Sequence, residues 1–285
     1  MQKHSTSFEA LGTHWSIETE QILSRQLLSA VRHRIEAFEK TYSRFRDDSL
    51  VFKIAKEEGV YSFPEDAATL FEFYEKLYEI TDGKVTPLIG GMLEKAGYDA
   101  SYSFVEKQQQ GLPSWDEAIE WNKPFLTVKK RVTLDVGAAG KGYLVDILSK
   151  MLDDAGIDDY IIDASGDMRH RGGLENRVGL EDPRAEGRVI GAIDVHNKSL
   201  CASAINRRKW GNGQHHMFDP DTMQPTQDII ATWVIAESAM VADGIATSLF
   251  LTNPKILRKS FNFEFLRMNK NGAIDYSPAF EGKLF

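Results

Sequence analysis

Helical spacing of apolar residues is the first pattern along the chain. Between residues 21 and 40, apolar side chains recur every three or four positions, which places them on one face of a helix. They are Ile22, Leu27, Leu28, Val31, Ile35 and Phe38. A second helix is predicted over 66–80, opened by Asp66 after Pro64 and closed at the Thr-Asp-Gly of 81–83. A third stripe follows a glycine-rich segment and ends at Gly156; it comprises Tyr143, Leu144, Ile147, Leu148, Met151 and Leu152.

Strand-like runs dominate the second half of the chain. Residues 125–136 (FLTVKKRVTLDV) predict a hairpin with its turn at KKR, and 160–165 (YIIDAS) predicts a strand, so that 132–165 forms a strand–loop–helix–strand unit. Short strands are predicted at 177–182, 188–195 and 199–205, a loop or hairpin at 210–220, and a strand at 232–237 followed by a helix from Ser238 to about Leu251. Because strands outnumber helices here, the pattern favours an α+β fold over a doubly wound parallel sheet.

Composition fits an ordinary globular protein. The 285 residues are 42% hydrophobic and 27% charged, and the length suits one large domain or two closely packed lobes. The net charge is −8, and the densest basic patch, RRKW at 207–210, is short. We therefore expect no nucleic-acid partner, since that function needs a basic face.

The chain gives no sign of export or of a membrane span. Cys201 is the single cysteine, so no intrachain disulfide is possible. The amino-terminal residues contain no apolar core of signal-peptide length, and no window approaches about 18 consecutive apolar residues. The expectation is a cytoplasmic protein, or a periplasmic one if a leader has been removed.

A glycine-rich loop, DVGAAGKGYLVD (135–146), lies between a predicted strand and a predicted helix. Loops in that position present free backbone N–H groups to anions, and Lys141 could meet a phosphate. The spacing is neither that of the P-loop nor that of the dinucleotide-binding fingerprint. A tight turn with a solvated lysine is the structural alternative.

Two further segments have the residue types of an active site. In VADGIATSLF (241–250), Asp243 and Thr247 are four residues apart and share a helix face, and their oxygens suit Mg²⁺ or Ca²⁺. The structural alternative is local capping by Asp243 and a Thr247 bond to the carbonyl four residues back. In GQHHMFDPDTMQP (213–225), a histidine could act as a base near neutral pH, whereas a polar hairpin with a turn at Asp219 is the alternative. Adjacent strand residues point to opposite faces, so at most one of the two histidines is expected to face a pocket.

Turns at SGDMRHRGG (165–173) and VGLEDP (178–183) are open to the same two interpretations. Gly166 and Asp167 follow a predicted strand, where α/β proteins often bind ligands. A simple turn explains them equally well.

In chain order, these segments resemble the FAD:protein FMN transferase family, also called the ApbE family. The matching segments are LGT (11–13), TYSRFRDDS (41–49), DVGAAGKGYLVD (135–146), SGDMRHRG (165–172), VGLEDP (178–183), HHMFDP (215–220) and VADGIATSLF (241–250). The resemblance implies a single α+β domain over 1–285, with two packed subdomains of mixed or antiparallel sheets flanked by helices and FAD in the cleft between them. It implies a Mg²⁺-dependent enzyme that moves FMN from FAD to a threonine hydroxyl of an acceptor flavoprotein and releases AMP.

The resemblance also implies roles for individual residues. It assigns the metal to the backbone carbonyl of Ala138 and the side chains of Asp243 and Thr247. It assigns Asp243 and His216 to catalysis, with His216 activating the acceptor hydroxyl. The positions that it assigns to FAD binding are Leu11, Tyr42, Thr86, Pro87, Leu88, Asp135, Lys141 and Met217.

The chain departs from the family pattern at Ser165, at 85–88 (VTPL) and at 201–210 (CASAINRRKW). Two alternatives stand beside the transferase: the first would use the same metal and phosphate site, and the departures motivate the second. One is a Mg²⁺-dependent FAD pyrophosphatase that gives FMN and AMP, and the other is an FAD-binding protein without turnover.

Overall fold

The computed structural model describes residues 3–211 and 213–285, so the part of the predicted 210–220 loop at residue 212 lies outside the described residues. An eight-stranded sheet runs in the order β1-β2-β6-β7-β10-β15-β16-β17, and every pairing in it is antiparallel. Its strands are β1 (His4–Ala10), β2 (Thr13–Thr19), β6 (Tyr160–Asp163), β7 (Asp167–Arg171), β10 (Ser199–Ala204), β15 (Ile229–Ala236), β16 (Glu264–Asn269) and β17 (Ile274–Tyr276). The predicted α+β class is confirmed.

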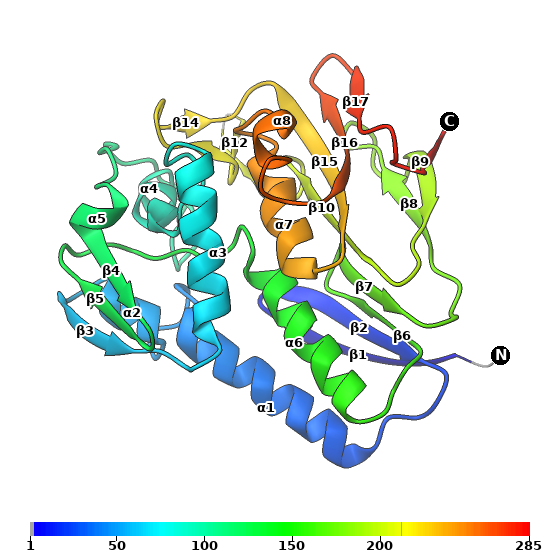
Figure 1. Cartoon of the computed structure of the whole chain (residues 1–285). Coiled ribbons are helices and arrows are strands. Elements are labelled where there is room, and N and C mark those ends of the chain that lie inside the picture. Colours follow the sequence, from blue (N-terminus) through cyan, green and yellow to red (C-terminus); the bar gives the residue numbers. More distant parts are fainter. Residues whose placement is uncertain (1–2, 212) are drawn as a thin grey trace.

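Helices cover one face of this sheet, and a small sheet covers the other (Figure 1). Helices α6 (Gly140–Asp154) and α7 (Ala239–Ser248) lie on the first face; β8 (Arg177–Glu181), β9 (Val189–Asp194) and β18 (Lys283–Leu284) form the small sheet. Successive side chains of β15 point to opposite faces of the sheet and contact both layers. Thr232 donates a hydrogen bond to a carbonyl of α7, whereas Trp233 packs in the hydrophobic cluster that contains Leu180 and Ile193. A strand buried on both faces explains the continuous apolar run at 233–236.

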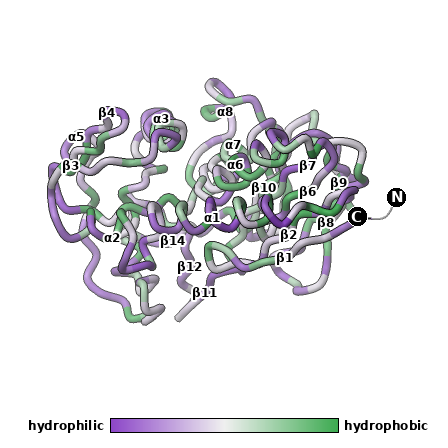
Figure 2. The backbone as a smooth tube through the Cα atoms, turned by 90° about the horizontal axis from the view of Figure 1, so that it is seen from below, coloured by the Kyte–Doolittle hydropathy of each residue, from purple (hydrophilic) through white to green (hydrophobic). Residues whose placement is uncertain are grey.

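A second group of elements lies beside the helix layer, on the left of Figure 1 except for α1, which runs below α6. It contains α1 (Arg25–Tyr42), α2 (Leu50–Ile54), α3 (Ala67–Ile80), the 3₁₀ turn η1 (Pro87–Ile89), α4 (Gly90–Lys95) and α5 (Trp115–Ala118), with the sheet of β3 (Gly59–Ser62), β5 (Phe125–Val128) and β4 (Ile119–Asn122). Short hairpins β11 (Lys209–Trp210) with β12 (Gln214–His215) and β13 (Phe218–Asp219) with β14 (Gln224–Pro225) follow β10, and α8 (Pro254–Leu257) follows α7. In Figure 2, α7 is largely hydrophobic.

Several predicted elements need correction. Ser24 accepts a hydrogen bond from the Leu27 N–H and starts α1 four residues later than predicted, so Ile22 lies outside the helix and is exposed. The helices predicted at 66–80 and 238–251 are confirmed as α3 and α7, with α7 ending at Ser248.

The predicted hairpin at 125–136 is wrong. Strand β5 pairs with β3 and β4, and the turn between β4 and β5 lies at Lys123 and Pro124. Residues 132–136 are not a strand, so the strand–loop–helix–strand unit lacks its first strand. Alternate apolar residues (Val132, Leu134 and Val136) are buried in the core, but side-chain packing takes the place of a strand partner.

A glycine allows α6 and α7 to approach each other. A Cβ atom at Gly142 would collide with the carbonyl oxygen of Ala239 and lie 2.8 Å from the Cβ of Asp243. In this position, the Gly142 N–H donates to Asp243 Oδ2 at 2.9 Å. The glycine therefore sets the distance between the loop that precedes α6 and the polar face of α7.

No helix within 3–211 or 213–285 has both the length and the apolar character that crossing a bilayer requires. The division into two subdomains stays a prediction.

We predict that Gly142→Ala lowers the free energy of unfolding by about 2 kcal/mol. Overpacking typically costs about 1–3 kcal/mol, and the better helix propensity of alanine offsets up to about 1 kcal/mol. Urea unfolding followed by circular dichroism measures the change. Gly111→Ala is the matched control, since no heavy atom lies within 4 Å of its added Cβ. Equal stabilities of the two variants would contradict the close approach of α6 and α7.

Candidate active site

A cavity of about 900 Å³ opens between the helix layer and the second group of elements. This volume lies near the upper end of the usual range for ligand pockets, about 300–1,000 Å³. Ten of the predicted site residues line it: Leu11, Tyr42, Thr86, Asp135, Ala138, Lys141, His216, Met217, Asp243 and Thr247. The fold thus brings together segments that are far apart in the sequence.

Two predicted FAD-binding residues, Pro87 and Leu88, lie elsewhere. Both are buried in η1, and Leu88 belongs to the main hydrophobic core. The backbone carbonyl of Pro87 accepts from the Asp135 N–H at 2.7 Å. Of the three residues at 86–88, only Thr86 reaches the cavity wall, and its neighbours support the glycine-rich loop from behind.

The glycine-rich loop is held in place by its own aspartates. Asp135 accepts from the Gly137 N–H through Oδ1 at 2.6 Å and from Arg44 Nε through Oδ2 at 2.5 Å. At the other end of the segment, Asp146 accepts from Ser238 Oγ and from the N–H groups of Ala239 and Met240, which caps α7. The two aspartates fix the loop and α7 in one arrangement.

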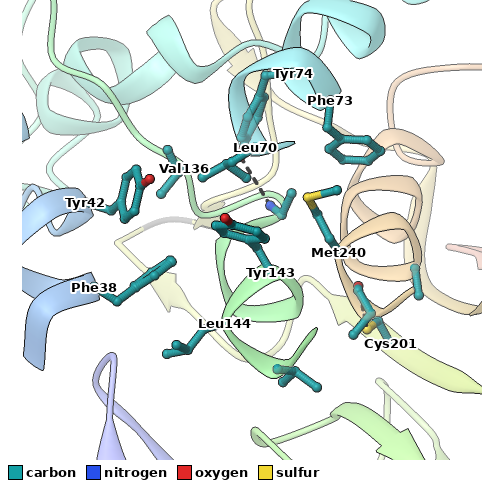
Figure 3. Close-up of a cluster of buried hydrophobic side chains, with 14 of the residues drawn as sticks. Phe38, Tyr42, Leu70, Phe73, Tyr74, Val136, Tyr143, Leu144, Cys201 and Met240 are labelled. Atoms are coloured by element: carbon teal, nitrogen blue, oxygen red, sulfur yellow. Dashed lines mark hydrogen bonds between the residues drawn. The ribbon is translucent and has the colours of Figure 1, made fainter. Parts of the chain in front are cut away.

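Buried aromatic side chains support the same loop. The hydroxyl oxygen of Tyr74 accepts from the Ala139 N–H at 3.2 Å, and Figure 3 shows this bond within the cluster that surrounds Tyr143. The Tyr42 hydroxyl, on the opposite side of the cluster in Figure 3, is buried at the cavity without a hydrogen-bond partner within the described residues. A ligand can supply the missing partner, because buried polar groups are rarely left unpaired.

Lys141 and two buried carboxylates form the charged centre of the cavity. Lys141 Nζ contacts Asp167 Oδ2, and Asp243 is almost completely buried beside them. Burial opposes the charged form of Lys141, but the charges of Asp167 and Asp243 outweigh it and raise its pKa. Burial, followed by the charge of Asp167, raises the pKa of Asp243 well above its usual range. If both carboxyl groups are ionised, one ammonium leaves an excess of negative charge. A proton on Asp243 relieves it, which is why the pKa of Asp243 is raised, and a bound cation would relieve it in the same way.

The predicted metal ligands fit a small hard cation. Asp243 uses Oδ2 for the Gly142 N–H, and Oδ1 accepts no hydrogen bond from residues 3–211 or 213–285. In the same part of the chain, neither the Thr247 hydroxyl nor the Ala138 carbonyl is hydrogen-bonded, and both residues line the cavity. Ser238, rather than Asp243, caps α7, so the structural alternative for this helix is wrong.

One carboxylate, one hydroxyl and one carbonyl are oxygen donors of the kind that Mg²⁺ binds while it keeps several waters. Among the described residues, no group of three or more His, Cys, Asp or Glu side chains has the geometry of a metal site. The fit therefore rests on this mixed oxygen set.

The two adjacent histidines have different environments, as the strand alternation predicts. His215 Nε2 bonds to the Thr226 carbonyl at 3.0 Å, and its Nδ1 accepts from the Met217 N–H, so this ring braces the hairpin. His216 lines the cavity, and its buried Nδ1 has no partner within the described residues. Burial, and then the charge of Arg208, lower the pKa of His216 well below its usual range. The ring is therefore neutral near pH 7 and able to accept a proton.

Sequence reasoning missed Arg44 and gave Asp167 no definite role. The Arg44 guanidinium is buried, pairs with Asp135 and lies 4.1 Å from the centre of the Phe45 ring. The sequence signal for Arg44 was its position inside the aromatic segment TYSRF. An arginine buried among such residues requires a carboxylate partner, so this position indicates a carboxylate nearby in the fold. Asp167 begins β7 in the Gly-Asp turn and makes the buried contact with Lys141.

Comparison with known proteins shows which family the chain resembles. The model of the ApbE family matches residues 11–264. A protein of Rhodobacter capsulatus named FAD:protein FMN transferase is 24% identical over 98% of this chain and 58% of its own length; proteins of the same name from Klebsiella pneumoniae and Escherichia coli K12 are each 23% identical over 87% of this chain and 78% of their own. The chain thus spans little more than half of the first relative.

Solved structures show the same fold. The ApbE protein of Thermotoga maritima superimposes with a TM-score of 0.85 at 24% identity, covering 98% of both chains. The flavin transferase ApbE of Vibrio cholerae gives a TM-score of 0.80 at 18% identity, again over 98% of both chains.

We predict that the His216 imidazole stays neutral at pH 6.5, where an ordinary histidine is about half protonated. Ring ¹⁵N chemical shifts, assigned by comparison with His216→Gln, measure its protonation. The unfolded chain binds more protons than the folded chain between the lowered pKa and about 6.5, so the stability that neutral His216 contributes falls as the pH drops through that window. A titration midpoint at or above 6.5 would contradict the assignment of His216 as a buried neutral base.

Proposed function

The chain belongs to the ApbE family, and we propose on that basis that it is an FAD:protein FMN transferase. The observation that carries the proposal is the convergence of Lys141, His216, Asp243 and Thr247 on one cavity. Phosphoryl transfer needs neutralised phosphate charge and a positioned nucleophile more than covalent participation by the protein. These four side chains supply the groups for both tasks.

The amino terminus of α6 and helix α7 form the cavity wall that would neutralise the phosphate charge of FAD. Lys141 lies in the first turn of α6 and carries the positive charge. Ala138, Asp243 and Thr247 would hold Mg²⁺, which would withdraw charge from the pyrophosphate oxygens. The excess negative charge of Asp167 and Asp243 gives this wall its affinity for a cation.

The transfer step requires a base for the acceptor threonine. Its hydroxyl oxygen forms a bond to the flavin-side phosphorus of FAD, and the bond from that phosphorus to the bridging oxygen breaks. AMP leaves with the bonding electron pair, and the threonine proton passes to His216. A neutral imidazole suits this role because its pKa lies below the working pH.

Localisation is a separate proposal. We infer a cytoplasmic protein, or a periplasmic one if a leader has been removed, and detection of the chain in fractionated cells distinguishes the two.

AMP release and covalent flavin on an acceptor together test the proposed function. We expect purified protein, FAD, Mg²⁺ and an acceptor flavoprotein subunit to give AMP and a fluorescent acceptor band in equal amounts. Chelation by EDTA should abolish both products, and added Mg²⁺ should restore them. AMP and free FMN without a labelled acceptor would identify a pyrophosphatase, and bound FAD without AMP would identify a binding protein.

Variants connect this activity to the site. Asp243→Asn should lower kcat/KM by about 100-fold or more, and His216→Gln should lower kcat by about 10²–10⁴-fold. Asp154→Asn is the matched control for loss of a carboxylate, because Asp154 lies exposed in the last turn of α6. Equal activities of Asp243→Asn and Asp154→Asn would contradict the assignment.

A further inference from the structure

Most cations around the cavity already have a carboxylate partner. Arg44 pairs with Asp135, Arg207 with Glu181 and Lys84 with Asp221. Arg208 and Lys209 also line the cavity, but within residues 3–211 and 213–285 no carboxylate lies within ion-pair distance of either. Of the two, Arg208 is half-buried and Lys209 is exposed. The charge of Arg208 is therefore not neutralised by a carboxylate among the described residues.

The backbone turns Arg208 inward. Along 207–210, exposure alternates, with Arg207 and Lys209 exposed, Arg208 half-buried and Trp210 buried. Arg208 lies in a bend directly before β11, and this alternation places Arg208 and Trp210 on the side that faces the protein. The Arg208 Cζ lies 5.8 Å from the centre of the Tyr98 ring, on which Trp210 stacks at 5.5 Å.

Arg208 acts electrostatically on the same groups as the proposed chemistry. Its charge contributes to lowering the pKa of His216 and opposes the rise in the pKa of Asp243. Lys209, by contrast, acts on His215, on the other side of the hairpin. Its charge also acts on Lys141, so the guanidinium belongs to the charged centre, although Arg208 immediately precedes β11 whereas Lys141 lies in α6.

We propose that Arg208, from the segment that leads into β11, binds the pyrophosphate of FAD and stabilises the charge that develops on the AMP phosphate as the bond to the bridging oxygen breaks. This inference rests on the proposed function. AMP departs with the electron pair of that bond, so negative charge on its phosphate grows during transfer. A guanidinium can meet two phosphate oxygens through parallel N–H donors, which an ammonium cannot do.

Equilibrium binding separates a phosphate contact from a purely structural role. FAD and riboflavin share the flavin ring, but riboflavin has no phosphate, so loss of a phosphate contact weakens only FAD. With EDTA present, flavin fluorescence should show Arg208→Gln binding FAD about 10- to 100-fold more weakly than the unsubstituted chain, with riboflavin affinity unchanged. Arg208→Lys should recover part of the loss, since it keeps the charge but not the fork.

Lys209→Gln is the matched control, because it removes the same charge from the adjacent position, which also borders the cavity but is exposed to solvent. We expect its FAD affinity to stay within about twofold of the unsubstituted chain, as for an exposed, screened charge. In the presence of Mg²⁺ and acceptor, Arg208→Gln should also lower kcat for AMP release, and Lys209→Gln should not.

The outcomes distinguish this inference from the proposed function. Equal losses of FAD and riboflavin affinity in Arg208→Gln would mean that Arg208 only shapes the aromatic wall, and would overturn the inference. Equal FAD affinities of Arg208→Gln and Lys209→Gln would overturn it as well. Failure of the unsubstituted chain to bind FAD would instead overturn the proposed function. Thermal unfolding of each variant establishes that it is folded before binding is compared.

Discussion

The close approach of α6 and α7 is the constraint on which the site depends. A side chain at position 142 would collide with the Ala239 backbone, so the two helices can meet only at a glycine. The Gly142 N–H then reaches Asp243, and Asp146, one turn further along α6, caps α7. One helix pair therefore positions the lysine, the carboxylate and the glycine-rich loop relative to one another.

The cavity contains two buried carboxyl groups whose ionised forms the folded protein alone does not balance. Asp167 and Asp243 are both buried, and Lys141 compensates only one of them. Burying carboxylates in this way costs stability, and a protein tolerates such a cost where function requires it. A divalent cation and the pyrophosphate of FAD would together complete the balance, with positive charge next to Asp243 and negative charge between Lys141 and Arg208. The unpartnered polar atoms of Tyr42 and His216 point to the same conclusion, because each has a hydrogen bond to offer a ligand.

Local pattern was sufficient to predict much of this arrangement. The i, i+4 spacing placed Asp243 and Thr247 on one face of α7, and strand alternation predicted that only one histidine of the pair faces the cavity. Pairing and partner choice could not be read in the same way. The alternation at 132–136 is that of a strand, yet its apolar side chains are satisfied by core packing and its backbone by other contacts, such as that of Asp135 with Pro87. The roles of Arg44 and Arg208 depend on residues far along the chain, which local patterns do not identify. For the same reason, the short basic patch at 207–210 gave no indication that Arg208 turns inward.

A crystal structure of the chain with Mg²⁺ and ADP, the part of FAD that retains the adenosine and both phosphates but lacks the flavin, tests the central claim most directly. The account predicts the metal bound to the Ala138 carbonyl, Asp243 and Thr247, and the two phosphates between the amino terminus of α6 and the β11–β12 hairpin. Phosphates bound away from Lys141, or a metal bound without Asp243, would contradict it.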